Sequence, residues 1–249
     1  MNKYAEIPVF IFCTNERTVD FSIYCVKKLG FNNIHKIDDN SPFHEKLYKF
    51  CELGLELDSD FFIRSDADRF IFSGIFDLIE KAYKNNHHWT EGLFFDHLMN
   101  RKRGGTPHIY HRKILQGVVE GKYNIDNYLK PESGLSWKLR DKHSIKVHSY
   151  NILTNLHDYE QCPSKIINTF INRLLRGNSS LYDWKNLKKI GFKKEVNKAF
   201  ELFKKNKDKK DCSYFDGLAC YNENIKAINP EDFSILYEKH LNIYNKKRV

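Results

Sequence analysis

The sequence of 249 residues contains no apolar run of about 18 or more residues, the length that a membrane-spanning helix needs. A secretory signal is also missing, because Glu6 precedes the strand-like Ile7–Cys13 and no small-residue cleavage site follows. These two absences lead us to expect a soluble, cytoplasmic protein.

Paired cysteine motifs are absent too. The chain has 6 cysteines, but none forms a Cys-x-x-Cys pair. Cys13, Cys25 and Cys51 fall in apolar segments, so we expect reduced core cysteines in a reducing compartment. Zinc-finger spacing and RNP-like aromatic stretches are missing as well, which argues against a nucleic-acid partner.

Charge of one sign is in excess. The formal net charge is +9, which implies an anionic partner such as a phosphorylated substrate or an anionic membrane face. Basic residues concentrate late in the chain, at 185–194, 204–210 and 246–248. Such runs are usually solvated helix faces, and this alternative stays open beside membrane docking.

Strand-length apolar runs alternate with segments of helical periodicity in the first third of the chain. The predicted strands are Ile7–Cys13, Asn33–Ile37 and Phe61–Ser65, with helices following each of them at 18–29, 41–57 and 73–79. Connections of this length favour parallel strands joined by right-handed crossovers. The pattern predicts an α/β protein with a nucleotide-binding type of central sheet flanked by helices.

The middle of the chain is less regular. We expect short strands at 92–95, 108–111 and 145–148, a basic glycine-containing loop at 101–107, and a short helix through Leu135 and Leu139. From Pro163 the periodicity becomes helical. We therefore divide the chain into a domain at 1–160 and a basic helical appendage at 161–249, packed on it.

Polar side chains follow each of the three predicted parallel strands. They are the turn Thr14–Arg17, the pair Asp38-Asp39 and the tripeptide Asp66-Ala67-Asp68. In open parallel sheets, ligands bind beyond the carboxyl ends of the strands. Two carboxylates with one residue between them can hold Mg²⁺ or Mn²⁺ together with a diphosphate. An isolated Asp-x-Asp is more often a solvated turn or a helix cap, so its neighbours decide its meaning.

Four segments in this order resemble the metal-dependent glycosyltransferases of the GT-A fold, close to glycosyltransferase family 2. Residues 8–17 resemble the family's opening strand and turn, and residues 37–41 its acidic turn for the nucleobase and ribose. Residues 64–68 resemble the Asp-x-Asp metal motif, and residues 131–140 the Glu-Asp motif with its helix. The resemblance covers Ile7 to about Glu160.

The resemblance implies a donor site and a cation site. The nucleotide of the donor would be held by Thr14, Asn15, Arg17, Asp38 or Asp39, and Asp66. Mn²⁺ or Mg²⁺ would be held on the diphosphate by Asp66 and Asp68. His157 resembles the late histidine that completes the cation shell in some GT-A enzymes, and His148 is the rival candidate.

Glu132 takes the position of the family's catalytic base. A carboxylate there removes a proton from the acceptor hydroxyl as it attacks the anomeric carbon, which predicts inversion. The dipole of the helix that follows lowers the pKa of Glu132, and burial would have to offset this. A carboxylate that merely decorates a helix start is the alternative.

The remaining polar candidates have several interpretations. The strand period places His108 and His111 on opposite faces, which argues against a metal pair. The pair His87-His88 is expected in an exposed turn. The cluster at 101–103 is either a contact to a diphosphate or an acidic acceptor, or a solvated loop.

Together these residues predict a glycosyltransferase of the hexosyl- or N-acetylhexosaminyl-transferase type, acting in polysaccharide biosynthesis. The donor would be a nucleotide-diphosphate sugar, a UDP-sugar first of all, and the acceptor a glycan or a lipid-linked molecule. Lysines, tyrosines and leucines at 236–247 would rest on a membrane surface near such an acceptor.

Two alternatives remain. A sugar-phosphate nucleotidyltransferase needs a glycine-rich, lysine-containing phosphate loop after the first strand, and the turn at 13–17 contains no glycine. A catalytically silent nucleotide- or glycan-binding module would need no base and no intact carboxylates.

Overall fold

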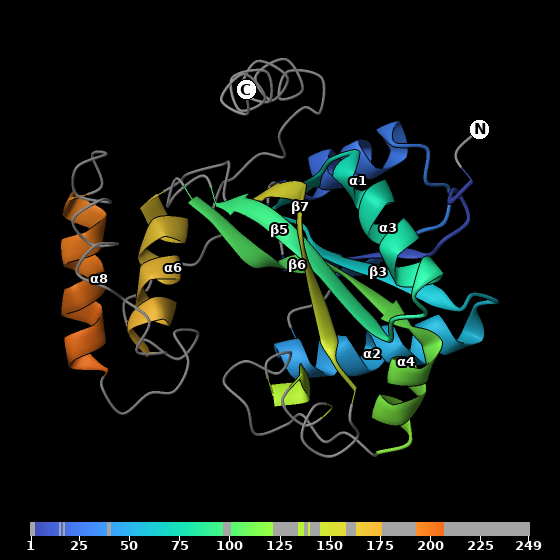
Figure 1. Cartoon of the computed structure of the whole chain (residues 1–249). Helices are drawn as coiled ribbons and strands as arrows, with labels where there is room; N and C mark the ends of the chain where they lie inside the picture. The colour runs from blue at the N-terminus through green and yellow to red at the C-terminus, as the bar shows by residue number, and fades with distance from the viewer. Residues whose placement is uncertain are drawn as a thin grey trace.

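The computed structural model of the chain shows a mixed α/β protein with one seven-stranded sheet and helices on both of its faces (Figure 1). It describes residues 3–14, 16, 18–38, 41–96, 101–121, 134–136, 139, 145–157, 163–175 and 193–206. The predicted fold class, a central sheet flanked by helices, is confirmed.

The strands are β1 (Val9–Cys13), β2 (Ile34–Asp38), β3 (Phe61–Asp66), β4 (Arg69–Ile71), β5 (Trp89–Asp96), β6 (Arg101–His111) and β7 (Val147–His157). The helices are α1 (Val19–Lys28), α2 (Phe43–Glu56), α3 (Gly74–Lys84), α4 (Arg112–Val119), α6 (Pro163–Leu175) and α8 (Lys193–Lys205). The three predicted strands of the first third and the helices between them are therefore present.

The sheet has the order β2-β1-β3-β6-β5-β7-β4. The first three of these strands are parallel to one another, as predicted, whereas β6 runs antiparallel to both β3 and β5. The basic loop expected at 101–107 is wrong, because these residues form the first half of β6. Their backbone pairs with Gly92–Asp96 of β5, a non-local contact that overrides the local signal of two glycines.

The sheet must curl, because β3 and β4 are joined by only Ala67 and Asp68. In the sheet order, β6, β5 and β7 lie between these two strands. A chain spans at most roughly 3.5 Å per residue. A link of two residues therefore keeps the end of one strand close to the start of the other. The curl therefore places the end of β3 beside the start of β4.

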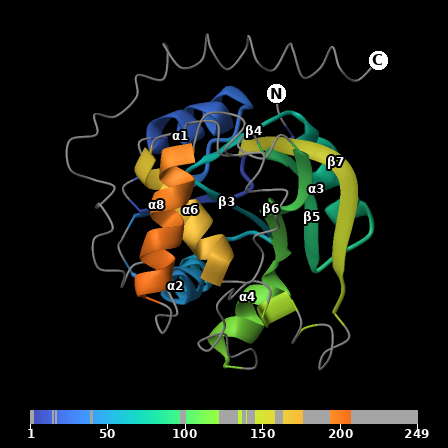
Figure 2. The same cartoon turned by 90° about the vertical axis from the view of Figure 1, so that its left-hand side faces the viewer.

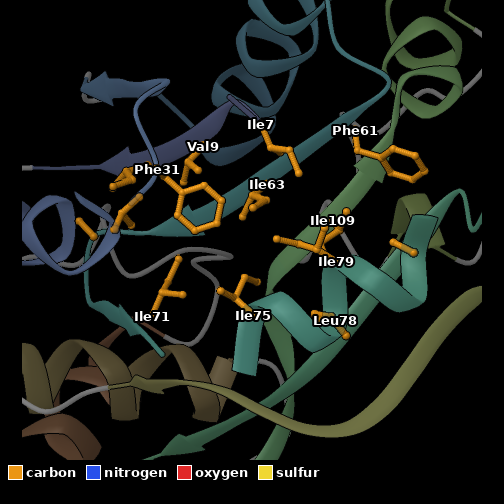
Figure 3. Packing of buried hydrophobic residues seen from close by; sticks show 14 of the residues in the cluster. Ile7, Val9, Phe31, Phe61, Ile63, Ile71, Ile75, Leu78, Ile79 and Ile109 are labelled. Carbon is orange, nitrogen blue, oxygen red and sulfur yellow. The ribbon is translucent and has the colours of Figure 1, made fainter. Parts of the chain in front are cut away.

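Alternating side chains of β1 enter two separate cores, as expected for a strand buried on both faces. Val9, Ile11 and Cys13 pack in the core between the sheet and the helices α1 and α3. Figure 3 shows the middle of this core, where Ile63 and Ile109 of the sheet lie near Ile75 and Ile79 of α3. Cys13, Cys25 and Cys51 are buried and form no disulfide bond, as predicted, and each lies in a different part of the core.

The opposite face of the sheet is covered by α2 and α4 (Figure 1). Phe10 and Phe12 of β1 point into this second core and pack there with Phe50 of α2 and Leu115 of α4. Leu135 and Leu139 are also fully buried in it, so this end of the segment 131–140 is anchored on the α2 side of the sheet.

Helices α6 and α8 lie side by side and share a core of their own (Figure 2). Phe170 of α6 and Phe200 of α8 meet edge to face, with ring centroids 5.4 Å apart. The division of the chain at about residue 160 stays a prediction. Among the helices that the structure describes, none combines the length and the hydrophobicity that a membrane crossing requires.

A group of histidines gathers at the edge of the sheet where β5 and β7 begin and β6 ends. The imidazoles of His87 and His148 stack at 3.4 Å between centroids, and Nε2 of His87 lies 2.8 Å from the Tyr150 hydroxyl. The rings of His88 and His111 lie 5.3 Å apart between centroids and are tilted by 54°. Loss of hydration on burial lowers the pKa values of all four imidazoles: His87, His88, His111 and His148.

This group predicts a loss of stability in mild acid. The folded state prefers the neutral rings, so their contribution is complete above the unfolded pKa of 6.5 and is lost as the pH falls below it. We expect the urea concentration at the unfolding midpoint to decrease as the pH is lowered from about 7 to about 5. This pH range lies above the one in which most carboxylates titrate.

The double variant His87→Phe/His148→Phe keeps two stacked rings and removes two titrating groups. Its unfolding midpoint should depend less on pH over the same range. A slope equal to that of the unchanged protein would show that these two histidines do not cause the effect.

Candidate functional site

The carboxyl ends of β1, β2 and β3 lie together at one edge of the sheet, as predicted. Phe12 is the register partner of Asp66, and Cys13 is the partner of Asp38. The backbone N–H of Ala67 donates to the Phe12 carbonyl at 2.9 Å, which ties the Asp-x-Asp turn to the end of β1. Ala67 is completely buried, so the turn has no room for a larger side chain there.

The curl of the sheet brings β7 to the same turn. β4 runs antiparallel to β7, and Arg69, directly after the turn, is paired with His157 at the end of β7. Nε2 of His157 consequently lies 3.5 Å from Oδ2 of Asp68. Two residues that are far apart in the sequence thus become neighbours at the strand ends.

A pocket of about 330 Å³ opens at this edge. The described residues that line it are Phe12, Thr14, Glu16, Phe43, Lys46, Asp66, Asp68 and His157. The structure therefore brings together four of the residues singled out in the sequence: Thr14, Asp66, Asp68 and His157.

Other candidates lie elsewhere. Asp38 ends β2 at the same edge, but it is exposed, forms an ion pair with Lys36 and is not among the described residues lining the pocket. His148 lies at the other end of β7, stacked on His87, so it is not near Asp68. Four further candidates fall outside the described residues: Asn15, Arg17, Asp39 and Glu132.

The carboxylate of Asp66 is surrounded by donors. Oδ1 accepts a charge-assisted hydrogen bond from Nη2 of Arg64, and Oδ2 lies 3.3 Å from Nε of Arg69 and 3.1 Å from the Thr106 hydroxyl. Arg69 also donates to the Thr106 carbonyl at 3.2 Å. Asp66 therefore links β3, β4 and β6 where the three strands meet, and two guanidinium groups offset its charge.

Arg64 is itself deeply buried, with 1% of its side chain exposed. Its guanidinium lies over the rings of Phe12 and Phe43, at 4.4 Å and 4.8 Å from their centroids. A buried cation is costly unless it is paired, and the two aromatic faces together with Asp66 stabilise it. Arg64 thus connects the pocket wall to the Asp-x-Asp turn.

A second buried carboxylate stands behind His157. Asp96, at the end of β5, is completely buried, and its Oδ2 lies 3.0 Å from Nη1 of Arg103 and 4.0 Å from Nδ1 of His157. At 4.0 Å this carboxylate lies beside Nδ1 of the ring but beyond hydrogen-bonding distance. Here the other nitrogen, Nε2, is the one that faces Asp68.

The described residues suit a cation that a substrate helps to hold. They contain no group of three or more His, Cys, Asp or Glu side chains that could hold a metal by itself. Asp68 and His157 provide an oxygen and a nitrogen at one point, and Mg²⁺ commonly takes one or two carboxylates plus substrate phosphates. Asp66 fits such a cation less well, because Arg64 and Arg69 already contact its oxygens.

Sequence reasoning missed several residues that build this site. Lys46 lines the pocket, Arg69 and Thr106 contact the Asp66 carboxylate, and Asp96 lies behind His157. A charged residue within an apolar pattern was the available signal. Lys46 lies on the face of α2 that buries Phe50, one turn later, and Arg64 interrupts the apolar strand β3.

Cys13 adjoins the pocket residue Thr14, but it is not a candidate nucleophile. Burial raises the pKa of its thiol to about 12, so the reactive thiolate is not available near neutral pH.

No protein-family model and no curated protein sequence matches the chain. Among solved structures, A197 from STIV is similar at 12% identity and a TM-score of 0.47, over 62% of this chain and 86% of that one. A CMP:2-keto-3-deoxy-manno-octonic acid synthetase complexed with CTP follows at 8% identity and a TM-score of 0.44, covering 60% and 91%.

A glycosyltransferase involved in glycosylation of the major capsid of PBCV-1 is similar at 9% identity and a TM-score of 0.35. That likeness covers 62% of this chain and 95% of the other. At such identities and scores these likenesses carry no argument for a family or an activity.

The two aspartates of the turn should respond differently to the same change. Asp66→Asn leaves Arg64 and Arg69 without their counter-charge, and we expect it to lower the free energy of unfolding by about 2 kcal/mol. Loss of one partner from a fully buried pair costs about 3–5 kcal/mol, and Asp66 is 29% exposed, so the lower figure applies.

Asp68→Asn is the matched control, because it removes the same charge from the same turn. Asp68 lies 3.5 Å from the His157 imidazole, whereas Asp66 contacts two guanidinium groups, so the unfolding free energy of Asp68→Asn should change by less than about 1 kcal/mol. Urea unfolding of both variants measures the difference. Equal losses in the two variants would contradict the structural role given to Asp66.

Proposed function

We propose that the protein is a glycosyltransferase that uses a nucleotide-diphosphate sugar, a UDP-sugar first of all, with Mn²⁺ or Mg²⁺. The supporting observation is that Thr14, Asp68 and His157 line one pocket at the carboxyl ends of β1 and β3. A carboxylate, an imidazole and a hydroxyl around one space provide the ligands that a cation-bound diphosphate requires.

In this proposal the two aspartates have separate tasks. Asp68 and His157 hold the cation, and Asp96 lies behind His157. Asp66 keeps the turn in place through Arg64 and Arg69, and its remaining exposed edge faces the nucleotide. When bound, the cation offsets the negative charge that builds up on the leaving diphosphate.

Thr14 and the neighbouring turn hold the nucleotide in the proposed complex. The backbone N–H of Thr14 donates to the Glu16 carboxylate, so the turn is folded back on itself at the pocket mouth. Asn15, Arg17 and either Asp38 or Asp39 remain proposed contacts to the nucleotide.

Glu132 remains the proposed general base. It precedes Leu135 by three residues, and Leu135 is buried in the core on the α2 side of the sheet. The base would take the proton of the acceptor hydroxyl as the acceptor oxygen bonds to the anomeric carbon and the bond to the leaving diphosphate breaks. A glycan or a lipid-linked molecule is the proposed acceptor, and the tail at 236–247 is the proposed membrane contact.

A sugar-phosphate nucleotidyltransferase is the second candidate. The solved structures that resemble the chain include proteins of both kinds, so they do not choose between the two activities. The absence of glycine from the turn at 13–17 favours the glycosyltransferase, because a phosphate loop needs backbone flexibility that glycine provides.

Calorimetric titration of the protein with UDP, with and without Mn²⁺, tests the proposal. We expect UDP to bind at least roughly tenfold more tightly with Mn²⁺, because the cation joins the diphosphate to Asp68 and His157. Asp68→Asn should remove this gain, whereas Asp77→Asn, which removes a carboxylate from an exposed position of α3 away from the pocket, should retain it.

Absence of metal-dependent UDP binding by the unchanged protein would favour the silent binding module. Two results together would favour the nucleotidyltransferase. The protein would bind CTP in place of UDP, and it would release pyrophosphate when CTP reacts with a sugar phosphate. A screen of hydrolysis across nucleotide sugars then identifies the donor.

The anomeric configuration of the product tests Glu132. The proposed mechanism predicts inversion, read by NMR from the product formed with the donor that the screen identifies, and Glu132→Gln should lower the rate of transfer by roughly 100-fold or more. Retention of configuration would remove Glu132 as the base and leave the cation site unaffected.

A further inference from the structure

Lys46 is a buried lysine that lines the pocket at the carboxyl ends of β1 and β3. It lies in the second turn of α2 and is 4% exposed, although it lines the pocket next to Thr14 and Phe43. Lysine is almost never fully buried unless it is paired. The contacts of its ammonium group therefore indicate what the residue does.

The ammonium group has neutral partners. Nζ donates to the backbone carbonyl of Cys13 at 2.5 Å and to the hydroxyl of Thr14. An ammonium group carries three donors, so these two bonds leave one for a further acceptor. Among the residues that the structure describes, no carboxylate forms an ion pair with Lys46.

The other charges around the pocket already have protein partners. Asp66 is contacted by Arg64 and Arg69, and Asp68 lies beside His157. Glu16 accepts the N–H of Thr14. Lys46 therefore differs from its neighbours, because its positive charge is buried and no described carboxylate lies within ion-pair distance of it.

We propose that Lys46 binds a phosphate group of the nucleotide, an inference that rests on the proposed function. A buried cation is stabilised most by an anion within hydrogen-bonding distance, and charge-assisted bonds of this kind are about twice as strong as neutral ones. In the complex, the phosphate supplies the counter-charge that the described protein residues do not.

The surroundings favour a phosphate over a nucleobase carbonyl. A neutral carbonyl would add a third dipole to the two that Lys46 already contacts and leave its charge uncompensated. Phe43, the first residue of α2, also lines the pocket, so the positive end of the helix dipole lies on the same side. Lys46 and the cation on Asp68 would then contact the diphosphate from two sides.

Comparison of UDP with uridine tests this role. In the presence of Mn²⁺, Lys46→Met should weaken UDP binding by roughly tenfold or more, because a hydrogen bond to a charged group is lost. Uridine, which has the same base and ribose but no phosphate, should bind equally well to both proteins. Calorimetry measures UDP, and NMR-monitored titration measures the weaker ligand.

Lys49→Met is the matched control, because it removes the same charge from an exposed position of the same helix. It should leave the affinity for UDP within about twofold. Lys46→Gln provides a second variant that keeps a donor for Cys13 and Thr14 but loses the charge, and its thermal unfolding shows whether the fold is retained.

The proposal is overturned if UDP and uridine lose affinity by the same factor in both Lys46 variants, or if neither loses any. Inorganic pyrophosphate with Mn²⁺, followed by phosphorus NMR, separates this result from a failure of the proposed function. If the unchanged protein does not bind UDP, the glycosyltransferase proposal falls. The phosphate-binding role of Lys46 is then still supported if the unchanged protein binds pyrophosphate and Lys46→Met weakens this binding. The role is overturned if the variant binds pyrophosphate equally well or if neither protein binds it.

Discussion

The two-residue connection between β3 and β4 constrains the rest of this structure. These strands follow each other in the chain but are separated in the sheet by β6, β5 and β7, so the sheet has to curl until its far edge returns to the connection. The bonds from the Asp66 carboxylate to Arg64, Arg69 and Thr106 join three strands at that point. The pocket lies beside this junction and is also lined by residues from the end of β1 and the start of α2.

The junction also separates the roles of two similar side chains. Asp66 is used mainly for structure, since donors from three strands contact its oxygens. Asp68 projects from the same turn toward His157, whose ring is backed by the buried Asp96. The pocket thus combines Asp66, which joins three strands, with Asp68 beside His157 and with Lys46 on the side of α2.

Local patterns predicted the parallel strands and their covering helices, because continuous apolar runs and helical periodicity are properties of short segments. They failed at 101–107, where glycines and charges indicated a loop and pairing with β5 imposed a strand. Thr14, Asp66 and Asp68 could be predicted because each follows a strand that the sequence identifies. Lys46 and Asp96 could not, because a single charge within a helix or at a strand end acquires meaning only from what packs around it.

By itself, the sequence determined the α/β class, the three parallel strands and the polar residues at their carboxyl ends. Each of these features depends on the order of apolar and polar residues within a short segment of the chain. Only the tertiary structure decided between His157 and His148 as the neighbour of Asp68. Both residues lie in β7, but only the end of the strand that contains His157 pairs with β4. The tertiary structure also brought the Thr106 hydroxyl of β6 to Asp66 and the buried Lys46 of α2 to the end of β1, through contacts between segments that lie far apart in the sequence.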